Sequence, residues 1–343
     1  MSARIRMVAR GSALGGGPLM STGSIAVIIA SRGVRPSLRQ ALDALAGQSL
    51  PADRFDVRVV IDGWETSVPS PDLGVPTSTV TGAARGPGAA RNHGAALASG
   101  EWLAFTDDDC VPEPDWLERA AQRIRDSGAT IIQGRTLEAG GASLMRFEDE
   151  DSPGAITTNL FVRRADFVAA GGFDEAFADP ERDLYFREDT DLVLRLLDSG
   201  ARQVFAPEVR VTHAALFADA GSPLRHARRH EFDALLQRRH PQAFHRSLEV
   251  KRIGPWRVHR PFHWASLATL TAWIAAALLL VTGHGRVAAL LAALALVGHA
   301  VAALRYARAG SRAAYWAGWA TPFVYVAALT RGCLRHGGWG VWR

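Results

Sequence analysis

The segment Phe105-Thr-Asp-Asp-Asp-Cys-Val-Pro-Glu-Pro-Asp-Trp116 decides the fold of this chain. Apolar residues over 101–106 predict a buried strand, and the prolines then turn the chain into a helix over 114–127. Asp107 and Asp109 can point the same way after this strand and hold a hard divalent cation through their carboxylate oxygens. For a bare run of three aspartates, the simpler interpretation is a solvated acidic turn that caps the helix.

Alternating strands and helices surround this segment. The run 24–30 is short, apolar and β-branched, which predicts a strand, and residues 36–48 have helical spacing. A second strand is predicted over 56–62, followed by a helix at 88–99, the strand at 101–106, the helix at 114–127 and a strand at 129–134. Repeated βαβ units predict an α/β fold, a Rossmann-like and mostly parallel sheet with flanking helices.

Acidic residues follow two of these strands at the point where each strand ends. In doubly wound sheets ligands lie outside the carboxyl ends of the strands. Asp62 and the run 107–109 both fall there. The order of the elements therefore predicts a cluster of carboxylates at one edge of the sheet.

The net charge of +5 is concentrated in one segment. Residues 225–260 hold ten lysines and arginines against three acidic residues, directly before an apolar stretch. This position favours a basic segment at the cytoplasmic face of a membrane. We expect no nucleic-acid partner, because no stacking motif accompanies the charge. The two cysteines provide neither a disulfide framework nor zinc-ligand spacing, which fits a reducing compartment.

The C-terminal part is predicted to be membrane-embedded. From Trp264 to Leu304 the only formal charge is Arg286, and the stretches 264–282 and 287–304 are each about long enough to cross a bilayer. Residues 313–330 are a third candidate, for which flanking arginines on both sides leave the positive-inside rule undecided. A buried helical bundle in a soluble domain is the alternative for all three stretches.

These patterns divide the chain into five parts. We expect residues 1–23 to be disordered or a misassigned start, 24–224 to form the catalytic domain and 225–263 to form a basic juxtamembrane segment. Two or three transmembrane helices follow over 264–330, and 331–343 is a short basic tail. The expected location is the cell membrane, multi-pass, with the catalytic domain in the cytoplasm.

Four motifs in order resemble those of the family 2 glycosyltransferases, which have the GT-A fold. The resemblance covers residues 24–215 and rests on these segments: Gly86-Pro-Gly-Ala-Ala-Arg-Asn-His-Gly94 with Ala98-Ser-Gly-Glu101, the Asp-x-Asp pair in Phe105–Trp116, Gly171-Gly-Phe-Asp-Glu175, and Arg187-Glu-Asp-Thr-Asp-Leu192. Each motif alone is weakly specific, whereas four in the family's order are strong. The chain departs from the family at Ala30-Ser-Arg-Gly33 and Ile61-Asp-Gly-Trp64, around the expected base and ribose.

The resemblance implies a role for each matching residue. Asp62 would contact the nucleotide base, Asp107 and Asp109 the donor ribose, diphosphate and metal, and His213 would complete the metal site. The cofactor would be Mn²⁺ or Mg²⁺. The full set of donor-binding candidates is Ala30, Arg32, Asp62, Arg91, Asp107 and Asp108. For Arg91, solvation of its own helix is an equal alternative to a diphosphate contact.

Asp189 is the implied catalytic base, and reaction chemistry supports this independently. Inverting transfer needs one base for the acceptor hydroxyl, while a diphosphate leaving group needs charge neutralisation, not a proton. Glu188 and Asp191 are candidates on the acceptor side. Simpler interpretations are a match of the Glu188-Asp189 pair to the dipole of a helix over 190–199, and an ion pair between Asp191 and Arg195.

The expected function is therefore inverting transfer of a sugar from a nucleotide-diphosphate-sugar to a hydroxyl of a lipid-linked or cell-envelope glycan acceptor at the membrane. A sugar nucleotidyltransferase is one alternative, although it would favour a glycine-rich triphosphate loop that residues 30–36 lack. A non-catalytic membrane protein that binds nucleotide sugars with the same fold is the other. The intact Asp107, Asp109 and Asp189 argue against it.

Overall fold

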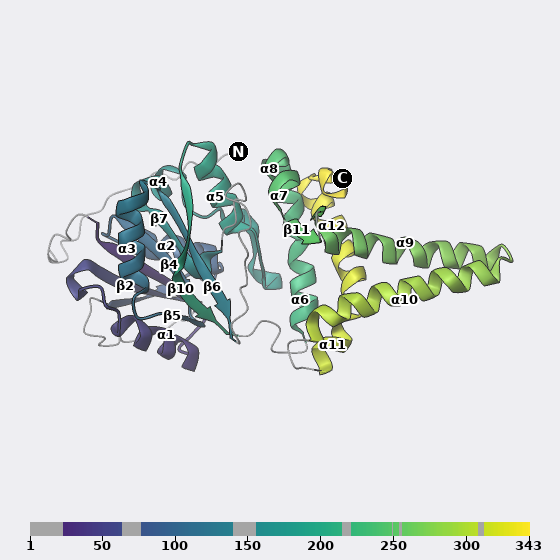
Figure 1. Ribbon diagram of the computed structural model, residues 1–343, viewed down its shortest axis with the longest axis horizontal. Coiled ribbons are helices and arrows are strands. Elements are labelled where there is room, and N and C mark those ends of the chain that lie inside the picture. Colours follow the sequence, from purple (N-terminus) through teal and green to yellow (C-terminus); the bar gives the residue numbers. More distant parts are fainter. Residues whose placement is uncertain are drawn as a thin grey trace.

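A computed structural model describes residues 23–63, 77–139, 156–214, 221–248, 250–253, 256–307 and 312–343. Residues 1–22 of the predicted disordered start lie outside these ranges, as does the predicted loop 69–76. Figure 1 shows a sheet-containing catalytic part joined to a helical part, from which two long helices project.

The catalytic part is built on an eight-stranded sheet in the order β3-β2-β1-β4-β7-β6-β10-β5. Its strands are β1 (Ile25–Ser31), β2 (Phe55–Asp62), β3 (Thr77–Gly82), β4 (Trp102–Asp107), β5 (Cys110–Pro112), β6 (Ile131–Glu138), β7 (Leu160–Arg163) and β10 (Gln203–His213). The predicted parallel arrangement holds for β3-β2-β1-β4 and for the β6–β10 pair. The sheet is nevertheless mixed, because β7 runs antiparallel to β4 and β6, and β5 runs antiparallel to β10.

Helices cover both faces of this sheet, and β1 shows how the sequence sorts them. Ile25, Val27 and Ile29 face the core beneath α1 (Pro36–Ala46) and α3 (Trp116–Ser127). Ala26 and Ile28 belong to the opposite core, under α2 (Pro87–Ala96), α4 (Arg164–Ala169) and α5 (Glu188–Asp198). Because alternate residues of a strand point to opposite faces, a continuous apolar run fits a strand covered on both sides.

Helix α2 lies unusually close to the sheet. A Cβ atom at Gly94 would approach the side chains of Ile28 and Val60 to 2.7 and 3.1 Å. A glycine is therefore required where α2 crosses β1 and β2, and this close approach brings Arg91 toward the ends of the strands.

The predicted basic juxtamembrane segment folds into helices that pack against the catalytic domain. These are α6 (Ser222–Arg229), α7 (Asp233–Arg239) and α8 (Pro241–Ser247), followed by the hairpin of β11 (Val250–Ile253) and β12 (Trp256–His259). Arg239 of this segment contacts Asp174 of the catalytic domain, whereas Arg260 is buried within the helical part and donates to the carbonyl oxygen of Val341. The segment is thus partly a structural interface, which the charge pattern alone did not predict.

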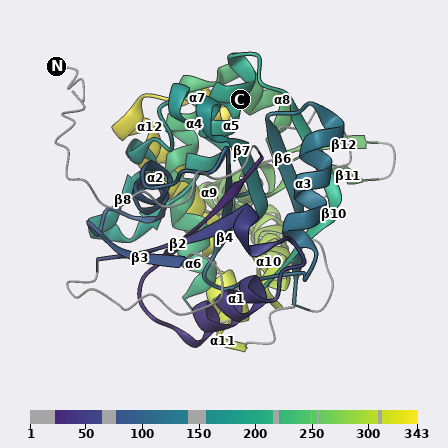
Figure 2. The same cartoon turned by 90° about the vertical axis from the view of Figure 1, so that its left-hand side faces the viewer.

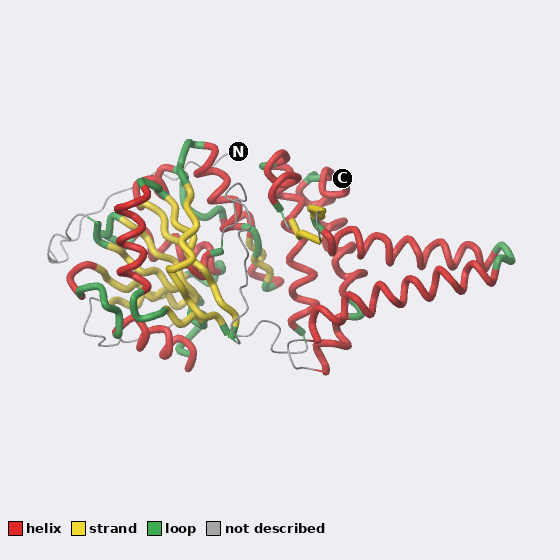
Figure 3. The backbone as a smooth tube through the Cα atoms, viewed as in Figure 1, coloured by secondary structure: helices red, strands yellow, loops and turns green. Residues whose placement is uncertain are grey.

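Two helices, α9 (Pro261–Val281) and α10 (Gly285–Ala307), form a hairpin that extends away from the sheet, as Figure 3 shows in red. Seen from the catalytic side in Figure 2, this hairpin lies behind the sheet. Both helices are long and apolar enough to cross a membrane, and their large apolar side chains, such as Leu278 and Leu290, are exposed. An apolar surface of this kind suits contact with lipid.

The third membrane candidate, 313–330, is not one continuous helix. It divides into α11 (Arg312–Gly318) and α12 (Thr321–His336). Tyr325, Leu329 and Cys333 of α12 are buried in a core cluster with Phe232 and Leu236. The apolar face of α12 therefore packs against protein and completes the core of the helical part.

Candidate active site

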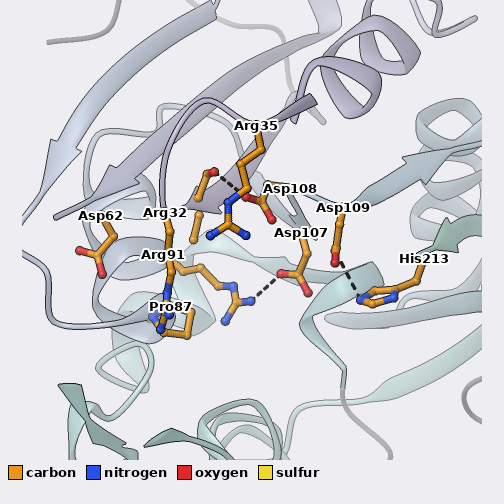
Figure 4. Close-up of a pocket in the computed structure, with 11 residues that line it drawn as sticks. Arg32, Arg35, Asp62, Pro87, Arg91, Asp107, Asp108, Asp109 and His213 are labelled. Atoms are coloured by element: carbon orange, nitrogen blue, oxygen red, sulfur yellow. Dashed lines mark hydrogen bonds and ion pairs between the residues drawn. The ribbon is translucent and has the colours of Figure 1, made fainter. Parts of the chain in front are cut away.

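A cavity of about 350 Å³ opens at the carboxyl ends of the parallel strands (Figure 4). Strand pairing explains its position, because Ala30 lies opposite Asp107 where β1 and β4 end, and Asp62 ends the neighbouring β2. The residues lining the cavity are Ala30, Ser31, Arg32, Arg35, Asp62, Pro87, Arg91, Asp107, Asp108, Asp109 and His213. Every predicted donor-binding and metal-binding residue lines it.

His213 reaches this cavity through the antiparallel pairing of β5 and β10. The register sets His213 opposite Cys110, so its Nε2 atom lies 3.4 Å from Oδ1 of Asp109. Potential ligand atoms of Asp107, Asp109, Cys110 and His213 all lie within 4.8 Å of one another. Cys110 is fully buried beside them, and burial raises the pKa of its thiol.

The three aspartates differ in their surroundings. Asp108 accepts a hydrogen bond of 2.5 Å from the hydroxyl of Ser31, while Asp109 faces His213. Burial raises the pKa of both Asp108 and Asp109 above the usual range. Desolvated carboxylates grouped in this way would be stabilised by a bound cation, so the donor set fits a divalent metal ion.

Arg91 connects the cavity to a second acidic pair. Its guanidinium donates to Asp107 at 2.6 Å and to Glu188 at 3.3 Å, although the residue is only 4% exposed. Of the two roles that the sequence left open for Arg91, solvation of its helix does not match this burial. The side chain instead holds the end of β4 against the start of α5.

Glu188 and Asp189 begin helix α5 beside this guanidinium. Burial, and after it the neighbouring Asp189 carboxylate, raise the pKa of Glu188 to about 7. Burial also raises the pKa of Asp189, against a hydrogen bond from the amide of Thr190. Both hydrogen bonds that Asp189 accepts from described residues reach Oδ1. Neither carboxylate lines the cavity itself; Arg91 joins Glu188 to it.

Asp62 has a structural contact in addition to its place in the cavity. Its Oδ2 accepts a 2.8 Å hydrogen bond from the amide of Gly86, just before α2. Gly86 has φ +99°, and a Cβ atom there would clash with the ring of Tyr185 at 2.1 Å. The glycine thus permits the turn that fixes one oxygen of Asp62.

Two motifs far apart in the sequence meet on the other side of α2. The side chain of Asn92 donates to the carbonyl oxygen of Phe173 and accepts from its amide, both at 2.8 Å. Gly172 precedes this contact at φ +71°, with no room for a Cβ beside Asn92. The segment Gly171–Glu175 is thereby fixed against the helix that carries Arg91.

Asp191 requires a correction. Its side chain is fully buried, where it accepts hydrogen bonds from Arg195 at 2.8 Å and His240 at 3.1 Å. Although burial opposes it, these partners hold the pKa of Asp191 below the usual range. A fully buried carboxylate has no exposed surface that an acceptor could contact. We therefore replace the predicted acceptor-side role of Asp191 with that of a residue that positions α5.

Sequence reasoning missed Ser31, Arg35 and Pro87 in the cavity and Arg187 behind it. Ser31 ends β1 and Arg35 follows it, so the strand-end argument that found Asp62 could also have found them. Arg187 adopts a left-handed conformation with φ 75° and donates to Asp233 of α7 at 2.7 Å. Its importance comes from a long-range contact that no local pattern encodes.

Comparison with known proteins agrees with this geometry. Residues 26–163 match the family model described as Glycosyl transferase family 2. The comparisons support a family 2 glycosyltransferase. This assignment favours sugar transfer over the nucleotidyl transfer considered above.

A curated relative of this glycosyltransferase is "Glycosyltransferase AglE" of Haloferax volcanii. It is 28% identical over 212 residues, which cover 56% of the chain and 67% of the relative.

One similar solved structure is the mannosyltransferase PcManGT from Pyrobaculum calidifontis in complex with GDP-Man and Mn²⁺. Its TM-score is 0.51 at 18% identity, and the match covers 91% of this chain and 87% of the PcManGT chain. This likeness shows the GT-A fold. S. aureus TarS has a TM-score of 0.47 at 18% identity over 65% of the chain, which spans 44% of that protein.

The raised pKa of Glu188 predicts a pH-dependent stability. At pH values between 4.5, the ordinary pKa of this group, and about 7, the folded glycosyltransferase retains a proton at Glu188 that the unfolded chain releases. The free energy of unfolding contributed by this group is therefore fully present below pH 4.5 and is lost as the pH rises through 7. Glu188→Gln should flatten this part of the profile, measured as the thermal midpoint over a pH series.

The matched control for this measurement is Glu181→Gln, a substitution at an exposed glutamate. It should keep the profile of the unmodified chain. An unchanged slope between pH 4.5 and 7 in Glu188→Gln would contradict the assignment.

Proposed function

We propose that this glycosyltransferase transfers a sugar, with inversion, from a nucleotide-diphosphate-sugar to a hydroxyl of a lipid-linked or cell-envelope acceptor at the membrane. One observation carries the proposal. The cavity at the strand ends contains a carboxylate and imidazole cluster, and a buried arginine joins it to Glu188, the chain neighbour of Asp189. A donor site and a base are the two parts that inverting transfer requires.

Donor binding is assigned to the residues that line the cavity. Asp62 at the end of β2 would contact the base, and Ala30 near the end of β1 and Arg32 directly after it line the same cavity. The cavity volume of about 350 Å³ lies within the range of small-molecule sites. The GDP-Man in the PcManGT structure supports a donor of this class for the shared fold.

A divalent ion, Mn²⁺ or Mg²⁺, would be held by Asp107, Asp109 and His213. When bound, such an ion neutralises charge on the diphosphate leaving group. The Mn²⁺ in PcManGT supports this proposal, and so does the short separation of the ligand atoms here. Cys110 stays a packing residue because a buried thiol with a raised pKa favours the protonated form.

Asp189 is the proposed base, which takes the proton of the acceptor hydroxyl as the new glycosidic bond forms. The Thr190 amide fixes Oδ1 at 2.7 Å and so orients the carboxylate. Its raised pKa makes it a stronger base than an ordinary aspartate. Glu188, which accepts a hydrogen bond from Arg91, is the neighbouring acceptor-side residue. Its raised pKa of about 7 keeps it protonated below that pH, so Asp189 then has a neutral neighbour.

The first prediction concerns the metal. Asp109→Ala removes a ligand, and since loss of an outer partner of a metal ligand already costs about 10–100-fold in affinity, we expect at least that loss in metal-dependent nucleotide binding. Isothermal calorimetry with GDP or UDP, with and without Mn²⁺, measures it. Asp126→Ala, at an exposed aspartate of α3, is the control and should bind normally. Unchanged affinity in Asp109→Ala would remove it from the metal site.

The second prediction separates the base from binding. Asp189→Asn nearly preserves shape but removes the basic oxygen, so turnover should fall by roughly 10²–10⁴-fold while donor affinity changes little. Its acid-side pH dependence should also weaken. The control is Asp198→Asn, at the exposed end of the same helix. Near-normal transfer by Asp189→Asn would move the role to Glu188, whereas lost donor affinity at unchanged turnover would make Asp189 a binding residue.

The third prediction concerns topology. With the basic helices α6–α8 on the same side as the catalytic domain, we expect both in the cytoplasm. An N-terminal tag should resist protease in right-side-out vesicles and be digested in inverted ones. An epitope inserted at the α9–α10 turn, where Gly283 and Gly285 have open space around them, should show the opposite pattern. The same pattern for both tags would exclude a hairpin that spans the membrane.

A further inference from the structure

The residue that precedes the acidic pair of α5 has an unusual backbone conformation. Arg187 is the N-cap of α5 and adopts φ 75° and ψ 0°, in the left-handed region. Residues other than glycine rarely adopt this conformation, so surrounding contacts have to stabilise it. Glu188 and Asp189 follow directly, and the amide of Asp191 donates to the carbonyl oxygen of Arg187 at 2.8 Å. The conformation of Arg187 therefore determines where the first turn of α5 begins.

The side chain of Arg187 is held by the helical part. Its Nε atom donates to Oδ1 of Asp233, at the start of α7, at 2.7 Å, and Nδ1 of His230 lies 2.9 Å from Oδ2 of the same carboxylate. The guanidinium also lies over the ring of Phe186, 4.1 Å from its centroid. Asp233 is 1% exposed, and although burial opposes it, Arg187 and His230 hold the pKa of this carboxyl below its usual range. The contact is thus an ion pair inside the protein, which needs both partners.

Asp233 is itself placed by a packed core. Its chain neighbour Phe232 belongs to a cluster of buried residues with Tyr325 and Leu329 of α12. Helix α12 in turn packs against α9 of the apolar hairpin. Figure 1 shows α7 on the side of the helical part that faces α5. A carboxylate of the helical part therefore holds the residue that leads into the acidic pair.

We propose that Asp233 is a positioning residue for the base Asp189 and acts through Arg187. The ion pair holds Arg187 in its left-handed conformation, and this conformation fixes the carboxylate of Asp189 relative to the donor cavity. Arg91 holds Glu188 from the catalytic side at 3.3 Å, so the first turn of α5 is held from two directions. The inference rests on the proposed function and adds that the helical part contributes to turnover as well as to membrane attachment.

A neighbouring ion pair provides an internal comparison. Glu231, also 1% exposed, accepts hydrogen bonds from Arg182 at 2.9 and 2.8 Å. Arg182 belongs to a short 3₁₀ helix, Pro180–Arg182, and not to the start of α5. Loss of either buried acid should lower the thermal midpoint, whereas loss of Asp233 alone should affect the base.

Steady-state kinetics of the full chain separate these roles. Asp233→Asn keeps the size of the side chain and removes its charge. We expect kcat to fall roughly 10–100-fold, because a shift of about 1 Å in a reacting group can cost 10²-fold, while KM for the donor stays unchanged. Glu231→Gln should keep kcat. In a chain that already carries Asp189→Asn, Asp233→Asn should cause no further fall in kcat, because it acts through that carboxylate.

Hydrogen exchange of the backbone amides tests the same inference without catalysis. Amides at the start of α5, including that of Asp191, should exchange faster in Asp233→Asn than in the unmodified chain, whereas those of α3 should keep their rates. Glu231→Gln should leave the start of α5 unchanged. Arg187→Gly breaks the ion pair from its other end, and glycine adopts φ 75° without strain. It should show the same loss of kcat, and it provides the test where Asp233→Asn does not fold.

Four results would overturn the inference: an unchanged kcat in Asp233→Asn, an equal loss of kcat in Glu231→Gln, independent losses from Asp233→Asn and Asp189→Asn, or unchanged exchange at the start of α5. A loss of kcat in Asp189→Asn with a normal kcat in Asp233→Asn removes this inference alone and leaves the proposed function intact. If the unmodified chain transfers no sugar, the proposed function fails, and the exchange rates still decide whether Asp233 holds the first turn of α5.

Discussion

The buried guanidinium of Arg91 is the constraint on which the site depends. It carries its charge at 4% exposure, and such a charge is tolerable only when it is paired and hydrogen-bonded. Asp107 and Glu188 supply that pairing from β4 and α5, which lie 81 residues apart in the chain. One side chain therefore fixes the distance between the proposed metal site at the end of β4 and the start of α5, which carries the proposed base. Gly94, one turn along α2, is what allows the helix to approach closely enough for this contact.

Much of this arrangement was predictable from the sequence because it follows from strand order. A strand rich in β-branched residues and a helix with regular spacing identify a βαβ unit, and parallel strands bring their carboxyl ends to one edge. This argument places Asp62, Asp107 and Ala30 together before any contact is known. His213 required the family resemblance, since the pairing of β5 with β10 that brings it to Asp109 has no local signature.

The packing of the basic segment and of residues 313–330 could not be predicted from the sequence, for a physical reason. Charge along the chain reports composition and not partners, so Arg239 and Arg260 were counted with a basic segment at the membrane, although Arg239 pairs with Asp174 and Arg260 is buried against Val341. Apolar stretches have the same ambiguity. Residues 313–330 have the composition of a span, but their apolar face is covered by Phe232 and Leu236. Whether an apolar helix meets lipid or protein depends on what folds beside it.

The buried acids of the helical part have a consequence for how this enzyme can be divided. Asp233 and Glu231 are each 1% exposed, and their partners Arg187 and Arg182 belong to the segment that leads into α5. A cut at residue 224, the boundary that composition indicates, would remove both carboxylates and leave these arginines without their partners. The catalytic domain is thus not an independent module that can be exchanged between anchors. Any such exchange has to keep the helical part and α5 together.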